Sequence, residues 1–261
     1  MRTRLILFAA VGAALTLAPR LLRPQSDSAF HLGTASVQAV AHFRAGINDL
    51  QNISMESANA HFKMAVDADP NFGLARVLWA GSAPLAQDQL TRELDRGVAD
   101  AVAHGSSDEV LLARAYRAAT LGNTDSAKVY FTSAAQTMPN DRLVAFSTPG
   151  SFFGGDAKFY RDFTAQHGDY ALAYNNLAYA EWAAGNKEAA LAAAKKQVEL
   201  IPNAPNAHDT YAELLQWNGD LAGATSHYKQ RRPFHQSFPK HMPGSPKWRH
   251  CRATTIRQGH I

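Results

Sequence analysis

Residues 171–206, ALAYNNLAYAEWAAGNKEAALAAAKKQVELIPNAPN, decide the fold because their key positions return 34 residues further along the chain. The second copy occupies residues 205–230. The matched positions are Tyr174, Leu177, Ala178, Gly185 and Ala190, which become His208, Tyr211, Ala212, Gly219 and Ala224. The repetition predicts that one structural unit is used more than once.

The first copy reads as two helices joined by a tight turn. Its large apolar residues Tyr174, Leu177 and Trp182 are spaced more like one face of a helix than like a strand. Gly185 ends this helix, since glycine tolerates the left-handed backbone of a helix end. A second helix over 187–200 consists of good helix formers and precedes Pro202. One such pair cannot bury its apolar face alone, so further stacked copies are expected.

Two more copies lie earlier in the chain. Their small, aromatic and proline positions are Gly46, Ala58, Phe62, Ala65 and Pro70 in residues 39–72, and Ala115, Gly122, Ala127, Phe131, Ala134 and Pro139 in residues 108–142. Period and residues resemble the tetratricopeptide repeat. The resemblance implies an all-α fold, a right-handed superhelical solenoid of antiparallel helix pairs. The first unit departs from it, with Ile53 where the family has glycine.

The predicted array spans residues 34–230. Clear units occupy 39–72, 108–142, 171–204 and 205–230, and degenerate helical pairs occupy 73–105 and 143–169. Residues 147–156, STPGSFFGGD, interrupt the helical pattern. They are interpreted as a loop anchored by Phe152 and Phe153, with a binding loop as the alternative.

The N-terminus predicts export. Arg2 and Arg4 precede an uncharged, mostly apolar run over 5–18, which is typical of a secretory signal and short for a membrane span. Residues 1–22 are therefore a signal peptide or an N-terminal anchor, and residues 23–33 a linker. The body is expected to be periplasmic or anchored to the outer face of a bacterial inner membrane, and to meet a membrane only through this segment.

Residues 231–261 do not continue the repeat. They contain 7 of the 26 Lys and Arg, 4 of the 11 His and the single cysteine, Cys251, but neither Asp nor Glu. A plausible back-translation read in a shifted frame from Lys240 gives AYAGLAEVAALQGDDDQARAY, which matches residues 173–190 in sequence and phase. A frameshift near codon 230 is the favoured interpretation. The alternatives are a basic tail that binds nucleic acid or anionic lipid, and a plain disordered extension.

The frameshift interpretation changes the meaning of the net charge. The whole chain has a formal charge of +4. Without the tail, the chain has 19 Lys and Arg and 22 Asp and Glu, so its net charge is negative. The basic balance is then no signature of nucleic-acid binding. A frameshift would also remove the repeat that covers the last helix. An exposed, adhesive face is therefore expected beside Tyr211, Leu214, Leu215 and Tyr228.

The sequence predicts neither enzyme activity nor a metal or cofactor. It has no Gly-rich phosphate loop, no HExxH and no CxxC. His42 and His61 fall in different helices, and the adjacent His208 and Asp209 point to different faces of one helix.

The sequence therefore favours a protein-interaction scaffold. The resemblance implies a concave groove lined mainly by the first helix of each pair, and it places six residues there: Asn175, Tyr179, Trp182, Asp209, Glu213 and Gln216. Aromatic and amide side chains suit the capture of a peptide or partner protein. For Trp182, packing between units is the alternative. The basic residues of the carboxylate clamp in chaperone-binding relatives are missing, so that specificity is not transferred. A second class is a regulatory or sensing fragment of a larger, truncated protein.

Overall fold

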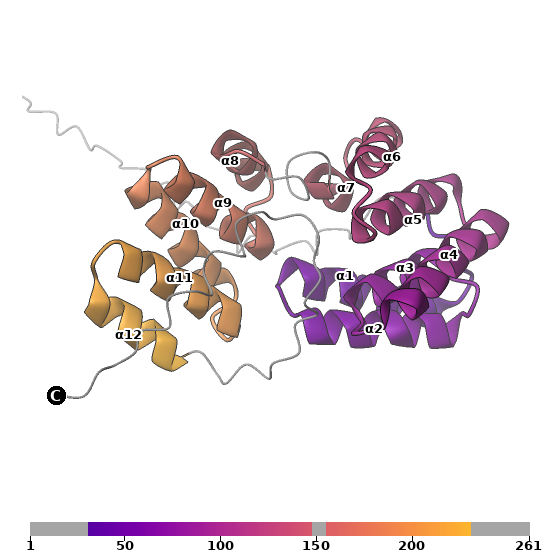
Figure 1. The fold of residues 1–261 in the computed structure, drawn as a ribbon, viewed down its shortest axis with the longest axis horizontal. Helices are drawn as coiled ribbons and strands as arrows, with labels where there is room; N and C mark the ends of the chain where they lie inside the picture. Colours follow the sequence, from indigo (N-terminus) through magenta and orange to yellow (C-terminus); the bar gives the residue numbers. More distant parts are fainter. Residues whose placement is uncertain (1–30, 148–154, 231–261) are drawn as a thin grey trace, which may run out of the picture.

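A computed structural model describes residues 31–147 and 155–230, and within these ranges the regular structure is entirely helical (Figure 1). Consecutive helices pack as pairs and the pairs stack, which confirms the predicted all-α solenoid. The helices are α1 (Val37–Gln51), α2 (Met55–Ala68), α3 (Gly73–Ser82), α4 (Gln87–His104), α5 (Ser107–Thr120), α6 (Thr124–Thr137), α7 (Arg142–Ser147), α8 (Ala157–Gln166), α9 (Ala171–Ala183), α10 (Lys187–Leu200), α11 (Pro205–Trp217) and α12 (Leu221–Gln230).

Small residues allow the helices of a pair to approach closely. A Cβ atom added to Gly46 of α1 would lie 2.6 Å from the ring of Phe62 in α2. The crossing of α3 and α4 is closer still, since a Cβ on Gly73 would lie 2.3 Å from the carbonyl oxygen of Gly97. Ala115 and Ala178, which occupy the position of Gly46 in their own units, are fully buried.

A residue with left-handed backbone joins the helices in four of the pairs. Gly122, Gly185 and Gly219 have φ angles of 77°, 85° and 91°, as the sequence pattern predicts for these glycines. In the first pair the same place is taken by Ile53, with φ of 58°. A β-branched side chain is strained in this conformation, so the first turn stores energy that the glycine turns do not.

The helices α5 and α6 begin at residues whose side chains cap them. Ser106 caps α5, and its hydroxyl accepts the N–H of Glu109 while the Glu109 carboxylate accepts the N–H of Ser106, forming a capping box. Asn123 caps α6 in the same sense, accepting the N–H of Ser126.

The short helix α7 joins two hydrophobic cores. Leu143 and Val144 belong to the core of the first six helices, whereas Phe146 stacks on Tyr170 in the core that α8 to α11 share. Arg142 secures this joint. It donates to Gln51 at the end of α1, and its Nη1 lies 3.1 Å from Asp169. The array therefore bends so that α1 also contacts α9 (Figure 1).

Several sequence predictions concern residues outside the described ranges. These are the signal or anchor segment 1–22, most of the linker 23–33, the loop residues Phe152 and Phe153, and the tail 231–261. At the borders of the loop, Ser147 is buried against the Tyr116 hydroxyl, and Asp156 caps α8. None of the helices within residues 31–147 and 155–230 is long and apolar enough to cross a membrane.

The expected adhesive face at the end of the array is wrong in part. Leu214 and Leu215 are buried, because α11 turns both side chains toward its neighbours, and Tyr211 and Tyr228 are half-buried. The large apolar side chains that are exposed at this end are Trp217 and Leu221.

Relieving the strain at Ile53 is expected to stabilise the fold. Ile53→Asn should raise the free energy of unfolding by about 1 kcal/mol, because asparagine adopts left-handed backbone at a lower cost than a β-branched residue. Ile53→Val keeps the branch and should bring no gain. Urea denaturation of both variants tests this, and an Asn variant no more stable than the Val variant would contradict the assignment of strain.

Candidate interaction surface

The helices α9 and α11 bring most of the predicted groove residues onto one surface. The Tyr179 hydroxyl of α9 donates to Oε2 of Glu213 in α11 at 2.7 Å, across a sequence separation of 34 residues. These are the same position in two successive repeat units. The contact therefore follows directly from stacking one first helix on the next.

Three rings form an aromatic cluster at the C-terminal ends of these helices. The ring of Trp217 lies 5.5 Å from that of Trp182 and 6.2 Å from that of Tyr179, measured between centroids. Trp217 is 41% exposed, whereas Tyr179 and Trp182 are half-buried. Trp182 therefore packs against the next unit, as one of its two interpretations predicts, while its contact with a partner stays a prediction.

Charged groups surround the cluster. The Lys187 ammonium lies 5.6 Å from the centre of the Trp182 ring, within the range of a cation–π interaction. Asp209 and Glu213 follow one another by one helical turn on α11. Burial, reinforced by the negative charges of Glu213 and Asp209, raises the pKa of the Tyr179 hydroxyl far above its usual value. The aromatic cluster therefore lies among charged groups of both signs.

Gln216 is exposed at the edge of this surface. Its side-chain oxygen accepts the Tyr228 hydroxyl of α12 at 3.1 Å, so the amide nitrogen is the end that can donate to a ligand. Asp209, Glu213, Gln216 and Trp217 of α11, together with Tyr179 and Trp182 of α9, are called the interaction surface below.

Asn175 does not belong to this surface as expected. It is 5% exposed, and its amide nitrogen donates to Thr210 at 2.8 Å and to Asn206 at 3.3 Å. The fully buried Gln197 of α10 also donates to Asn206. Asn175 therefore satisfies a buried polar network between α9, α10 and α11, and the geometry assigns it to packing rather than to ligand contact.

Trp217 was missed by the sequence reasoning. It is the last residue of α11 and follows Gln216, the position that matches Trp182 in the preceding unit. The signal that would have found it is a large aromatic residue one place before the turn Asn218-Gly219. A side chain at the very end of a first helix is covered less by neighbouring helices than one in its middle.

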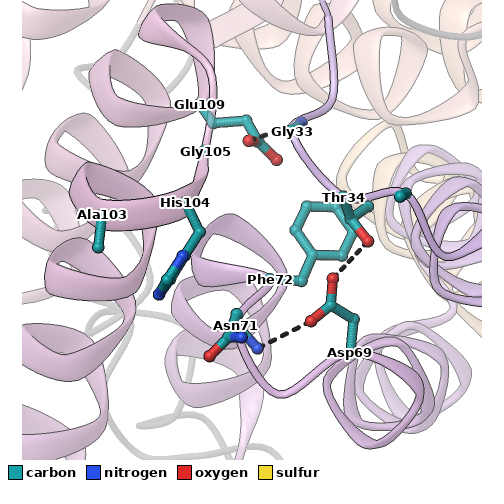
Figure 2. Close-up of a pocket in the computed structure, with 10 residues that line it drawn as sticks. Gly33, Thr34, Asp69, Asn71, Phe72, Ala103, His104, Gly105 and Glu109 are labelled. Carbon is teal, nitrogen blue, oxygen red and sulfur yellow. Dashed lines mark hydrogen bonds between the residues drawn. The ribbon is translucent and has the colours of Figure 1, made fainter.

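A separate pocket of about 430 Å³ lies at the other end of the array, where residues 33–35 cross the start of α5 (Figure 2). Glu109 accepts the backbone N–H of Gly33 at 2.9 Å, and Thr34 donates to Asp69. Burial raises the pKa of Glu109, while the N–H groups of Ser106 and Gly33 oppose this effect. These contacts tie the end of the predicted linker to the first core.

Histidines form local pairs rather than a metal centre. His61 and Asp49 lie 2.7 Å apart, and the rings of His42 and His61 stack at 6.1 Å. Among the described residues, no group of three or more His, Cys, Asp and Glu side chains is placed to hold a metal ion. His208 does not pair with Asp209, because its ring nitrogens face Pro202 and His227.

The pair His208 and His227 links the last two helices. The carbonyl oxygen of Pro202 can only accept, so the Nε2 atom of His208 carries a hydrogen and donates at 2.7 Å. Nδ1 of His208 then accepts from Nδ1 of His227 at 3.0 Å. Burial is the main cause that lowers the pKa of His227, and the neighbouring His208 lowers it further.

Repeated helix pairs joined by left-handed turns give this chain a helical repeat fold of the kind that the resemblance to the tetratricopeptide repeat implies. Neither a protein-family model nor a curated protein matches its sequence. Similar solved structures share 74% of this chain. They are MamA (16% identity, 90% of that chain, TM-score 0.27), the APC/C heterotetramer Cut9–Hcn1 (18%, 39%, 0.46) and PilW, a type IV pilus biogenesis factor (16%, 91%, 0.45). Because these TM-scores are below 0.5, the repeat architecture rests on the helix pairs of this chain.

A substitution at Asn175 is expected to act on stability. Asn175→Ala removes a donor from the buried Thr210 hydroxyl and one of the two donors to Asn206, and it should lower the free energy of unfolding by about 1–3 kcal/mol. Gln216→Ala, at an exposed position of α11, should change the free energy of unfolding by less than about 0.5 kcal/mol. Chemical denaturation of both variants tests this difference. If both substitutions change the free energy of unfolding by the same small amount, Asn175 is again a candidate for ligand contact.

The histidine pair predicts a pH effect on stability. Since the pKa of His227 is lowered in the folded protein, its neutral form stabilises the fold above the ordinary histidine pKa of about 6.5, and this stabilisation is lost as the pH falls through that value. His227→Phe keeps a ring against Tyr211 but cannot be protonated. Unfolding measured at neutral pH and near pH 5 should therefore show a smaller loss in the Phe variant. An unchanged loss would assign the acid sensitivity to other groups.

Proposed function

We propose that this protein is an interaction scaffold that binds an extended segment of a partner protein on the interaction surface. The observation that carries the proposal is the exposure of Trp217 beside Trp182 and Tyr179. Tryptophan and tyrosine are enriched among residues that dominate binding energy in protein interfaces. Here they sit on the ends of two packed helices, which hold them in place before a partner arrives.

The polar groups of the surface suit the backbone of an extended segment. The Gln216 amide donates, and the Asp209 and Glu213 carboxylates accept, so both backbone carbonyl and N–H groups find complements. Binding needs no catalytic group. Among the described histidines, His61, His208 and His227 make contacts within the array.

The proposal places the scaffold outside the cytoplasm. Its basis is the basic start and apolar run within residues 1–22, which favour a signal peptide or an anchor. A scaffold held at or beyond the inner membrane meets partners there, and contact with lipid is confined to this segment.

The aromatic cluster is expected to carry the binding. Peptides selected from a random dodecamer library against the whole protein should bind Trp217→Ala at least about 30-fold more weakly, the loss typical of an interface hot spot. Val129→Ala removes an exposed apolar side chain from α6 and should leave binding unchanged. Circular dichroism confirms that both variants keep their helices.

The affinities are measured by fluorescence anisotropy with labelled copies of the selected peptides. Peptides that bind Trp217→Ala and the unchanged protein equally would refute the interaction surface. A library that yields no binder would argue against peptide capture as the function.

A further inference from the structure

The pocket of about 430 Å³ at the other end of the array has electronegative walls (Figure 2). The helices α2 and α4 both end at this pocket, since their C-caps, Asp69 and Gly105, line it. The C-terminal end of a helix carries partial negative charge and favours a cation. Among the 10 described residues that line the pocket, Asp69 and Glu109 are carboxylates, the basic residue is His104, and none is Lys or Arg.

One carboxylate oxygen of Glu109 is left without a partner. The Oε2 atom accepts the backbone N–H groups of Gly33 and Ser106, both at 2.9 Å. The Oε1 atom has no hydrogen-bond partner in the part of the chain that the structure describes, and the residue is only 1% exposed. Figure 2 shows this oxygen pointing across the pocket toward Thr34 and Phe72. A buried polar atom without a hydrogen bond is costly, so a donor that enters the pocket gains free energy by binding Oε1.

The charge of Glu109 is also poorly compensated. Burial is the main cause that raises the pKa of this carboxyl group, and among the charged groups that act on it His31 favours the ionised form while Asp69 opposes it. Both oxygens of Asp69 are engaged, one by the Thr34 hydroxyl and one by the N–H of Asn71. Asp69 therefore adds negative charge to the pocket, and Glu109 supplies the open acceptor.

The number of open acceptors selects the kind of cation. A calcium ion takes about six to eight oxygen ligands, and the described residues hold no group of three or more His, Cys, Asp and Glu that is placed to bind a metal ion. The forked donors of a guanidinium are matched by two carboxylate oxygens. A primary ammonium has three donors that rotate freely, so one oxygen can hold it while backbone carbonyl groups take the other donors. Ala35, Phe72 and Ala103 line the same pocket and suit a short carbon chain.

We propose that this pocket binds the primary ammonium of a small alkyl amine or of a lysine side chain, with Oε1 of Glu109 as the acceptor. Residues 33–35 line the pocket and belong to no helix. Contacts of Gly33 with Glu109 and of Thr34 with Asp69 attach this segment. The ammonium enters beneath the segment, which shifts outward to uncover Oε1. The site lies on other helices than the interaction surface, so each of the two proposals can fail without the other.

The test compares amines with neutral molecules of the same shape. The diamine putrescine is paired with butanediol, and N-acetyl-lysine methylamide is paired with N-acetyl-norleucine methylamide. Calcium chloride serves as the inorganic cation. Each probe is titrated into the full-length protein by calorimetry in an amine-free buffer. At least one amine should bind about tenfold or more tightly than its neutral counterpart, because a charge-assisted hydrogen bond is about twice as strong as a neutral one.

Two variants locate the binding. Glu109→Gln removes the charge but keeps an oxygen for the capping box, in which glutamine also serves. This variant should bind the amine at least about tenfold more weakly. Glu56→Gln removes an exposed carboxylate at the start of α2, whereas the pocket lies at the end of that helix, and it should leave the affinity unchanged. Circular dichroism confirms that both variants keep their helices.

The outcomes also name the source of the ammonium. Binding of either amine that is weakened by Glu109→Gln supports the inference, and the amine that binds more tightly indicates whether the ligand is a free amine or a lysine side chain. Equal binding of each amine and its neutral counterpart, no measurable binding of either amine, or an affinity that survives Glu109→Gln overturns it. Calcium binding that depends on Glu109, without binding of an amine, also overturns it and assigns the pocket to a metal ion.

Discussion

The close approach of two helices at small residues is the constraint on which this structure depends. Gly46 faces the ring of Phe62, and Gly73 faces the backbone of Gly97, at distances that leave no room for a side chain. Each helix pair buries one apolar face between its own two helices and leaves a second apolar face to be covered by the neighbouring pair. The neighbour must be present, because a single pair would expose that second face to water. Repetition is thus the condition for folding, and the surfaces of successive first helices come together as its consequence.

The period of 34 residues was enough to predict the array, since the turn glycines and small residues recur at fixed offsets. It was less informative for the pair α3 and α4, where the close contact relies on Gly73 and Gly97 instead of the family positions. Nor does the pattern predict that the six-residue α7 joins two cores through Arg142, Gln51 and Asp169. That joint brings together residues far apart in the sequence, and no local periodicity records it.

The site shows the same limit at the level of single residues. Tyr179 and Glu213 occupy equivalent positions in successive units, and the structure has them in contact, although the sequence pattern did not predict that contact. The same equivalence assigned Asn175 to the groove, although Thr210 and Asn206 draw its amide into the interior. A repeat position fixes the side of a helix on which a residue lies. Whether that side is open depends on the polar partners and the size of the neighbours, and these differ from unit to unit.

The packing that buries α11 also prepares the surface it presents. Ala207, Thr210 and Leu214 face the array and are almost fully buried. Asp209, Glu213 and Trp217 lie on another face of the same helix, so their spacing is set by a backbone that cannot shift without disturbing the core. A loop carrying the same three side chains would have to be ordered on binding, at a cost in conformational entropy. Because the helix is already ordered by folding, a segment that binds at Trp217, as proposed, would require less ordering of this surface than of a loop.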